Sequence, residues 1–213
     1  AADTEFQRHN QKLIAFVSET DEENAFHIVL REPLGDGDKP LEGKKIRGNA
    51  FYAPMVEPLG GSLVNLPGGE IYPSLERGVV DGAGWSVIGT PTLKLHEVAG
   101  YMMRPTFGTL PTYITMNLDK WNSLSAEDQA LFLKMGREVE QEAASFSSVL
   151  VEEALQEMAA GGMQMTTMSP ELSKKLLAGS KKALWDIARN SNDQSTEFVN
   201  ALHELAVIGG DAE

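Results

Sequence analysis

The stretch that decides the fold runs from Leu41 to Trp85 and reads LEGKKIRGNAFYAPMVEPLGGSLVNLPGGEIYPSLERGVVDGAGW. Its pattern predicts three short strands, at residues 44–47, 62–66 and 79–81. Two short helices are expected between them, at residues 50–59 and 70–77. Gly60 and Gly78 follow these helical segments and are typical helix stops. Strands that alternate with helices indicate an α/β domain with a parallel sheet.

Two candidate ligand-binding side chains stand at the ends of these strands. Arg47 closes the first strand and Trp85 follows the third, and in open α/β sheets ligands bind just beyond the carboxyl ends of the strands. A guanidinium group binds a carboxylate through two parallel charge-assisted hydrogen bonds. We therefore predict a binding cleft at this edge, although position alone also fits a surface arginine and a tryptophan that caps the core.

Three nearby residues allow both a structural and a ligand-binding interpretation. Asn49 is a natural helix N-cap and also lies close to Arg47. Phe51 either stacks on a ligand or packs on its own helix face. Gly68 either lets a ligand approach the backbone or permits a tight turn.

The composition excludes several classes of protein. The 213 residues carry a formal net charge of −13, which argues against a nucleic-acid partner, because such a partner needs clustered Lys and Arg. The absence of cysteine excludes disulfides and thiolate chemistry. No run of roughly 18 apolar residues occurs, so we expect no direct membrane insertion.

Outside the first stretch the pattern predicts further strands and helices. The strands are expected at residues 12–17, 25–30, 101–107, 111–117 and 163–167. The helices are expected at residues 90–99, 125–161 and 169–187. Apolar residues of the longest helix recur at steps of three or four and form one stripe, namely Leu131, Met135, Val139, Ala143, Phe146, Leu150, Ala154 and Met158. This helix would span on the order of 50 Å, and the stripe also fits a coiled-coil seam.

Motifs of enzymes and metal sites are incomplete. Gly82 and Gly84 begin a GxGxxG pattern, but Val87 stands where the third glycine is needed. No serine lies in a GxSxG motif, and the four histidines show no metal-ligand spacing. We therefore predict no enzymatic activity, no cofactor and no metal ion.

Three motifs resemble those of a known family. LEGKKIRG, LGGSLVNLPGGEIYPSLERGVVDGAGW and YITMNLDKWNSLSAEDQ are similar to segments of the solute-binding proteins of tripartite ATP-independent periplasmic (TRAP) transporters, the C4-dicarboxylate-binding class. The resemblance covers roughly residues 26–185. It implies an α/β fold of the periplasmic-binding-protein-like type II, with two lobes joined by crossover strands and a long bridging helix. Members of this family usually begin with a further segment, so we expect the N-terminal lobe to be incomplete.

The resemblance also suggests how the chain is divided. Residues 22–90 and 125–190 are expected to form the binding lobe with its bridging helix. Residues 1–21 and 91–124 would be a remnant of the second lobe, and residues 191–213 a C-terminal helical tail.

The site residues are likewise implied by the resemblance. In the family the arginine of the KIR motif clamps the ligand carboxylate, and Arg47 matches it. A subgroup with the LPGGEIYP motif usually has Glu-Trp where this chain has Gly84 and Trp85, and it carries a metal ion beside the ligand. We therefore expect no metal ion here, and extra room for a bulkier acid. The candidate ligand-binding residues are Arg47, Trp85, Asn49, Phe51, Gly68, Phe107, Thr109 and Tyr113.

The implied function is that of a periplasmic solute-binding protein. It would capture a small organic acid, such as a dicarboxylate, and deliver it to the membrane subunits of a TRAP-type secondary transporter. A ligand-sensing module of a signalling receptor has the same fold and is an alternative. An enzyme that uses the same cleft is a third hypothesis.

Overall fold

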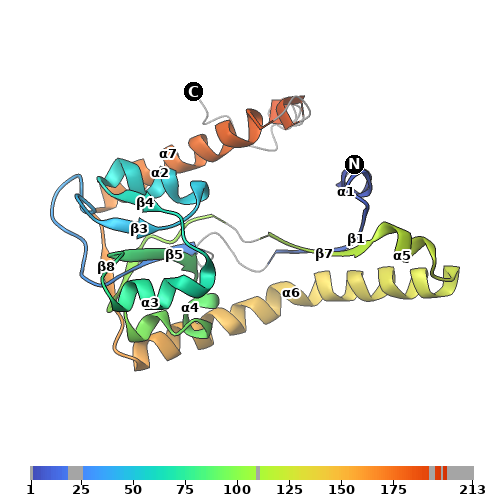
Figure 1. Cartoon of the computed structure of the whole chain (residues 1–213), viewed down its shortest axis with the longest axis horizontal. Helices are drawn as coiled ribbons and strands as arrows, with labels where there is room; N and C mark the ends of the chain where they lie inside the picture. Colours follow the sequence, from blue (N-terminus) through green and yellow to red (C-terminus); the bar gives the residue numbers. More distant parts are fainter. Residues whose placement is uncertain (1, 19–25, 109–110, 192–194, 198, 201–213) are drawn as a thin grey trace. The chain divides into compact units, whose positions relative to one another are not determined.

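The structure is a computed structural model that describes residues 2–18, 26–108, 111–191, 195–197 and 199–200 (Figure 1). The contacts within the chain define two compact units. Unit 1 comprises residues 1–27, 86–92 and 106–161, and unit 2 comprises residues 28–85, 93–105 and 162–213. The assignment of residues to the lobes of a binding protein stays a prediction.

The larger sheet has six strands in the order β4-β3-β5-β2-β6-β8. The strands are β2 (Phe26–Leu30), β3 (Lys45–Arg47), β4 (Ser62–Val64), β5 (Gly82–Ser86), β6 (Tyr101–Arg104) and β8 (Gln164–Thr167). β3 runs parallel to β4 and β5, and β8 runs parallel to β6, whereas β2 is antiparallel to β6. The parallel part β4-β3-β5 confirms the predicted alternation, and it brings three carboxyl ends to one edge of the sheet.

Short helices connect the parallel strands. Between β3 and β4 lie η1 (Ala50–Tyr52), α2 (Ala53–Val56) and η2 (Glu57–Leu59), and between β4 and β5 lie η3 (Gly68–Glu70) and α3 (Ile71–Glu76). After β5 and β8 come η4 (Leu95–Glu97) and α7 (Pro170–Arg189). Figure 1 shows α2 and α7 on one side of the sheet and α3 on the other. The core between them is fully buried and includes Ile28, Leu30, Leu41, Ile46, Met55, Leu59, Ile71, Leu75 and Met103.

The segment predicted as one helix over residues 50–59 consists of three short turns instead. Pro54 and Pro58 lie inside it, and proline has no backbone N–H to donate to a continuous helical ladder. Gly60 then ends the segment with a φ of +87°, a left-handed conformation that glycine adopts without strain.

The predicted strand at residues 79–81 is wrong in position. The backbone N–H groups of Val79 and Val80 donate to the carbonyl of Ser74 at 2.9 and 3.4 Å, so these residues close the turn after α3. The regular strand β5 therefore begins only at Gly82. As a consequence, Trp85 lies inside β5, next to its last residue, and does not follow it.

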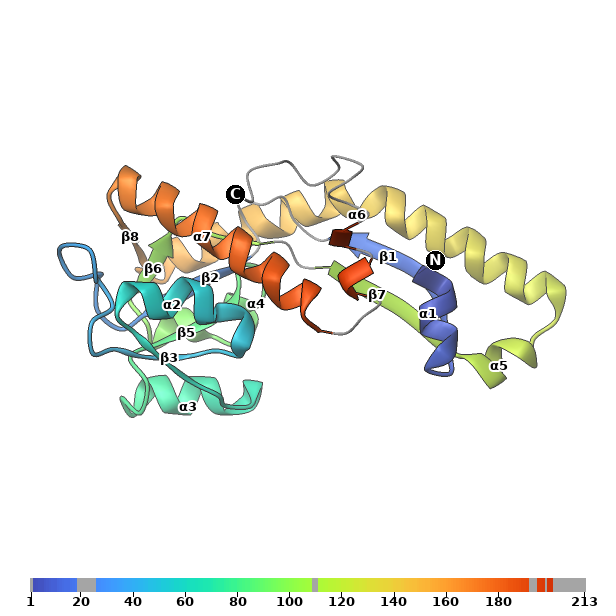
Figure 2. The same ribbon diagram turned by 90° about the horizontal axis from the view of Figure 1, so that it is seen from above.

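Unit 1 is built on a two-stranded antiparallel ribbon with a long helix beside it. The ribbon pairs β1 (Gln11–Ser18) with β7 (Pro111–Asn117). Figures 1 and 2 show α6 (Ala126–Ala160) running alongside the ribbon. The other helices of unit 1 are α1 (Ala2–Arg8), α4 (Gly89–Thr92) and α5 (Leu118–Asn122). The Ser125 side chain accepts a hydrogen bond from the backbone N–H of Asp128 and begins α6, which confirms the predicted N-cap.

The apolar stripe of α6 is buried only toward the C-terminal end of the helix. Ala154 and Met158 are buried, as the stripe predicts, but Leu131 and Met135 are about half exposed and Phe146 is 64% exposed. Within the described residues, the first half of the stripe therefore has little covering it.

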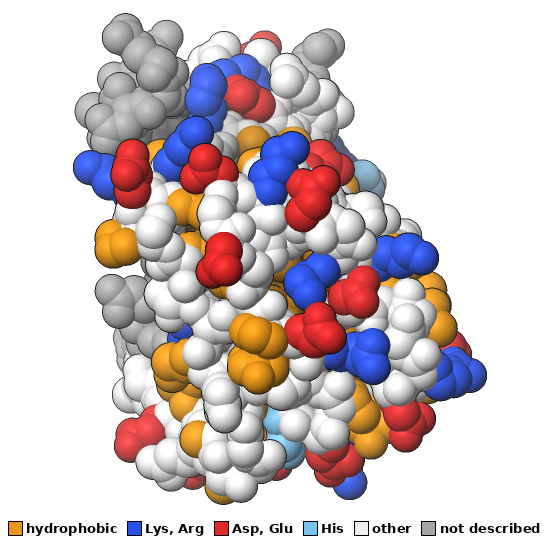
Figure 3. Space-filling view, turned by 90° about the vertical axis from the view of Figure 1, so that its left-hand side faces the viewer, with side chains coloured by type: hydrophobic (Ala, Val, Ile, Leu, Met, Phe, Trp, Pro, Cys, Tyr) orange, Lys and Arg blue, Asp and Glu red, His pale blue; other side chains and the backbone are white. Residues whose placement is uncertain are grey.

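The surface shows no gathering of one charge on the face drawn in Figure 3. Acidic and basic side chains are interspersed there among the described residues. That face therefore offers no continuous basic area of the kind that binds a phosphate backbone. Among the described helices, none is long and apolar enough to cross a membrane.

Candidate anion-binding site

Arg47 lies at the carboxyl end of the central parallel strand. Its strand alternates between exposed Lys45, buried Ile46 and half-buried Arg47, so Ile46 anchors β3 in the core. In the register of the sheet, Arg47 lies between Val64 of β4 and Ala83 of β5. The structure thus confirms the position that the sequence predicts for this side chain, at the edge where open α/β sheets bind ligands.

Two backbone carbonyls hold the guanidinium of Arg47 in place. Its Nε–H donates to the carbonyl of Leu66 at 3.0 Å, and Nη1 donates to the carbonyl of Gly84 at 3.2 Å. These acceptors belong to the chain segments of the two neighbouring strands. Within the described residues, these two bonds leave three of the five N–H groups of the guanidinium for a further acceptor.

The charge of Arg47 is fixed in position but not neutralised. Burial lowers the pKa of Arg47 from its ordinary value, because the charged form is partly withdrawn from water, while the nearby Tyr52 acts in the opposite direction. Among the described residues, no carboxylate forms an ion pair with it. A guanidinium stays protonated in such surroundings, so an anion at its free end would be stabilised.

Trp85 lies beside this charge, and Gly68 lies beside Trp85. The Cζ of Arg47 is 5.1 Å from the centre of the Trp85 ring, which is a cation–π contact. Both side chains are half-buried. A Cβ at Gly68 would lie 3.4 Å from Cη2 of Trp85, so Gly68 is next to the outer edge of the indole. The structure therefore links three of the predicted site residues by direct contacts, and a ligand-binding role for each stays a prediction.

Asn49 and Phe51 are close to this group in the chain, but the structure shows a local role for each. The Asn49 side chain accepts a hydrogen bond from the N–H of Phe51 at 3.1 Å and caps η1. The ring of Phe51 meets the ring of Tyr52 edge-on, with their centres 5.5 Å apart. Contact of either residue with a ligand stays a prediction.

The remaining predicted site residues do not belong to unit 2. Phe107 is 3% exposed and pairs with Phe26 through a β-bridge. Tyr113 is exposed, and its ring centre lies 5.3 Å from that of Phe16. Thr109 lies outside the described residues. A ligand-binding role for these three residues stays a prediction.

Tyr52 is not among the site residues predicted from the sequence, and the sequence predicts extra room at Gly84. The structure corrects this expectation, because the ring of Tyr52 occupies the space next to Gly84. Tyr52 is 4% exposed. The signal in the sequence was the pair of glycines, Gly48 and Gly84, that directly flank Arg47 and Trp85 along the chain.

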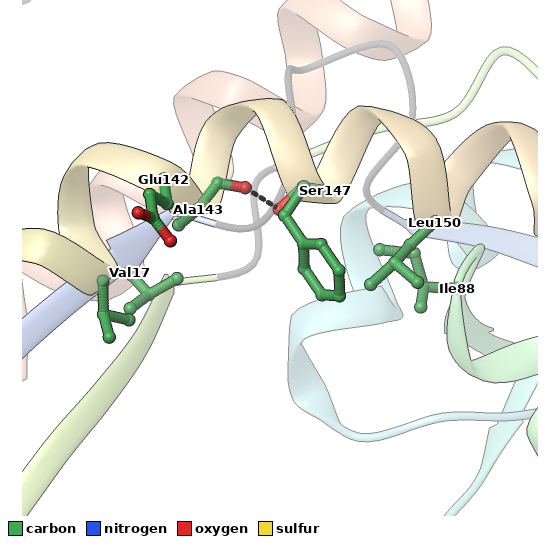
Figure 4. Close-up of a pocket in the computed structure, with 8 residues that line it drawn as sticks. Val17, Ile88, Glu142, Ala143, Ser147 and Leu150 are labelled. Atoms are coloured by element: carbon green, nitrogen blue, oxygen red, sulfur yellow. Dashed lines mark hydrogen bonds between the residues drawn. The ribbon is translucent and has the colours of Figure 1, made fainter.

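Unit 1 contains a separate groove of about 500 Å³ along α6. Figure 4 shows its lining, which consists of Val17, Ile88, Val139, Glu142, Ala143, Phe146, Ser147 and Leu150. The hydroxyl of Ser147 is already engaged, since it donates to the carbonyl of Ala143 at 2.6 Å. The ionisable group in this lining is the carboxylate of Glu142, so the groove does not suit an organic anion.

Among the described residues, no group of three or more His, Asp or Glu side chains is arranged so that it could hold a metal ion. The side chains shown to interact with Arg47, those of Trp85 and Tyr52, carry no carboxylate. Hard cations such as Ca²⁺ and Mg²⁺ require several oxygen ligands.

Comparison with known proteins places these features in a family. The profile of the bacterial extracellular solute-binding proteins, family 7, matches residues 2–190. A monocarboxylate 2-oxoacid-binding periplasmic protein of Nostoc is 29% identical over 161 residues, which are 74% of this chain and 43% of the relative. The ectoine-binding periplasmic protein of Halomonas elongata is 29% identical over 49% of this chain and 31% of the relative. This chain thus spans less than half the length of these relatives.

Solved structures confirm the predicted α/β fold of the type II periplasmic binding proteins. A TRAP periplasmic solute-binding protein of Rhodoferax ferrireducens with bound malonate has a TM-score of 0.80 at 18% identity, over 95% of this chain and 64% of that chain. The ectoine-binding protein of Halomonas elongata has a TM-score of 0.78 at 21% identity, over 93% and 65%. A Bordetella pertussis receptor that binds pyroglutamic acid has a TM-score of 0.80 at 16% identity, over 95% and 66%.

Proposed function

Since this chain belongs to family 7 of the bacterial extracellular solute-binding proteins, we propose that it captures a small organic acid and that Arg47 binds the acid's carboxylate. The observation that carries this proposal is the state of the Arg47 guanidinium. Two backbone carbonyls orient it, an indole covers it, and its free N–H groups have no carboxylate partner in the described chain.

The energetics favour an anion at this position. A partly buried charge that lacks a counter-charge is costly, because water no longer solvates it fully. A ligand carboxylate that receives two charge-assisted hydrogen bonds repays that cost. Since the Nε–H is already bonded to Leu66, the carboxylate would approach the end of the guanidinium that carries Nη1 and Nη2.

The named relatives are consistent with this chemistry. The proteins from Rhodoferax ferrireducens, Bordetella pertussis and Nostoc bind malonate, pyroglutamic acid and monocarboxylate 2-oxoacids, respectively. Each of these ligands carries a carboxyl group. We infer only that the ligand of this chain carries a carboxylate, because the rest of the ligand differs from one relative to the next.

We propose the wider role on the basis of the family. In this role the protein acts outside the cytoplasm, in the periplasm, and delivers its ligand to the membrane subunits of a TRAP-type transporter. It binds its ligand and does not transform it. Release and capture would follow a change of conformation that the ligand stabilises by contacts absent in the unliganded state.

A thermal-shift and calorimetry panel tests the proposal. The acids are malonate, pyruvate, pyroglutamate and glucuronate, with glucose as an uncharged control. Binding stabilises the folded chain by about 2.7 kcal/mol at a ligand concentration 100 times the Kd. We expect at least one acid to raise the melting temperature and glucose to leave it unchanged. If none of the acids binds, or if glucose binds as well as glucuronate, the proposal is wrong.

A further inference from the structure

Tyr52 is seated between two glycines that flank the site. It is the last residue of η1, the short helix that follows β3 and Arg47, and its side chain is almost completely buried. A Cβ at Gly48 would lie 3.0 Å from Cβ and 3.1 Å from Cδ2 of Tyr52. A Cβ at Gly84 would lie 2.6 Å from Cζ of Tyr52 and would overlap ring atoms Cδ1 and Cε1. The tyrosine ring thus fills the space that a side chain at residue 84 would need.

Backbone conformation does not explain these two glycines. Neither Gly48 nor Gly84 is among the glycines with positive φ, so another residue could adopt the same backbone angles there. Both glycines are buried. At Gly84 the absence of a side chain is therefore explained by the space that Tyr52 takes. At Gly48 a Cβ would meet both Tyr52 and Cδ2 of Leu63, each at 3.0 Å.

Gly84 links Tyr52 to Arg47. The carbonyl of Gly84 accepts the hydrogen bond from Nη1 of Arg47 at 3.2 Å. A side chain at residue 84 would point at the tyrosine ring. Packing of the ring against residue 84 thus holds the acceptor that orients the guanidinium. Burial also raises the pKa of Tyr52, so the phenol stays neutral and adds no negative charge that would compete with a ligand.

We propose that Tyr52 stands in for the missing side chain of residue 84, positions Arg47 through Gly84, and sets the size of the acid that the site accepts. This inference rests on the proposed function, because it concerns the same site. The acid that fits would be a small carboxylate, since the buried ring and not free space lies next to Gly84, whose carbonyl holds the guanidinium. Tyr52 is on this account a positioning residue that also determines specificity.

The packing part of the inference is tested without any ligand. Gly84→Ala should lower the melting temperature by roughly 5 °C, because the added methyl group overlaps the ring. In the Tyr52→Ala background the same substitution should cost almost nothing. Gly69→Ala is the matched control, because a Cβ at Gly69 meets no atom within 4 Å. Equal losses from Gly84→Ala in both backgrounds would overturn the inference.

The specificity part is tested with two acids of different size, pyroglutamate and glucuronate. Tyr52→Ala should shift the ratio of their affinities by about tenfold toward glucuronate, since a missing large side chain opens room for several heavy atoms. Tyr52→Phe should keep the wild-type ratio, because the ring remains. Tyr72→Ala is the control, because Tyr72 is a tyrosine of unit 2 that bonds Glu97 at 3.2 Å. A merely structural role would lower stability and leave the ratio unchanged.

The outcomes separate this inference from the proposed function. If the wild-type chain binds an acid and Tyr52→Ala leaves the ratio unchanged, the inference is wrong and the proposed function stands. If Arg47→Ala binds the acids as well as wild type does, the proposed function is wrong. In that case the melting temperatures of Gly84→Ala with and without Tyr52→Ala still test whether the ring packs against residue 84.

Discussion

The guanidinium of Arg47 lies over the ring of Trp85, with Cζ 5.1 Å from the ring centre. An aromatic face stabilises a cation through its quadrupole but carries no net charge. The carbonyls of Leu66 and Gly84 likewise orient Arg47 without neutralising it. The site therefore keeps a full positive charge in a fixed orientation.

Removing this charge should strongly weaken carboxylate binding. Arg47→Ala is expected to weaken binding of any acid that the wild-type chain binds by roughly 2–5 kcal/mol, the cost of truncating one partner of a buried charge pair. Arg47→Lys should recover only part of the loss, because an ammonium group cannot bond a carboxylate through two parallel bonds. Calorimetry with the tightest acid of the panel measures both.

Arg77→Ala is the control for these variants. Arg77 also donates its Nε–H to a backbone carbonyl, that of Pro73 at 3.0 Å, but it is exposed and outside the site. Its loss should leave affinity unchanged. Equal weakening by Arg77→Ala and Arg47→Ala would mean that net charge, and not a specific clamp, drives binding.

Truncating the indole should have a smaller effect than removing the charge. Trp85→Leu is expected to weaken acid binding by about 0.5–2 kcal/mol, the range of cation–π contacts. Trp185→Leu is the control, because Trp185 lies on α7 and not on a strand of the parallel sheet. Isothermal titration calorimetry measures the affinity of both variants for the acid. A Trp85→Leu protein with unchanged affinity would show that the indole does not help Arg47 to bind the carboxylate.

The parts of this site differ in how far sequence predicts them. The position of Arg47 at a strand end was predictable because alternation in β3 and the glycine-rich junctions are local signals, whereas its proposed role as a clamp rests on the resemblance of the KIR motif. The carbonyl acceptors of Leu66 and Gly84 were not, because any residue carries a backbone carbonyl and only the sheet register selects two of them. The contact of Tyr52 with Gly84 also depends on tertiary packing between segments 32 positions apart.

The same distinction applies to the fold. The helix α6 was predicted within one or two residues, since Ser125 and Gly161 mark its ends and its apolar stripe is continuous. The strand β5 was placed three residues too early, because the Val79–Val80 pair has strong β propensity but closes a turn. Local propensity was overridden there by the hydrogen bonds to Ser74.

Stability at high pH should report on the burial of Tyr52. Its pKa is raised above the ordinary value of 10.0 by burial, so the unfolded chain loses the phenolic proton before the folded chain does. Above about pH 10 the unfolded state therefore binds fewer protons than the folded state. The free energy of unfolding then falls by about 1.4 kcal/mol per pH unit because of this group. Below that pH the group contributes no pH dependence.

Chemical denaturation at several pH values from 9 upward measures this dependence. Tyr52→Phe removes the titrating hydroxyl and should make the decline of stability with pH shallower. The comparison of the two proteins cancels the contribution of the lysines, because these titrate in the same pH range in both. Parallel pH profiles for wild type and Tyr52→Phe would contradict the buried position of the phenol.

Two glycines inside helices should respond in opposite ways to alanine. A Cβ at Gly136 of α6 would overlap the carbonyl oxygen of Ile14 in β1, whereas a Cβ at Gly179 of α7 meets nothing within 4 Å. Gly179→Ala should therefore stabilise the chain by about 0.8–1 kcal/mol through helix propensity alone. Gly136→Ala gains the same propensity but must push α6 away from the ribbon, at a cost of about 1–3 kcal/mol. Urea denaturation of both variants measures the difference, and a stabilised Gly136→Ala protein would show that α6 does not pack closely on β1.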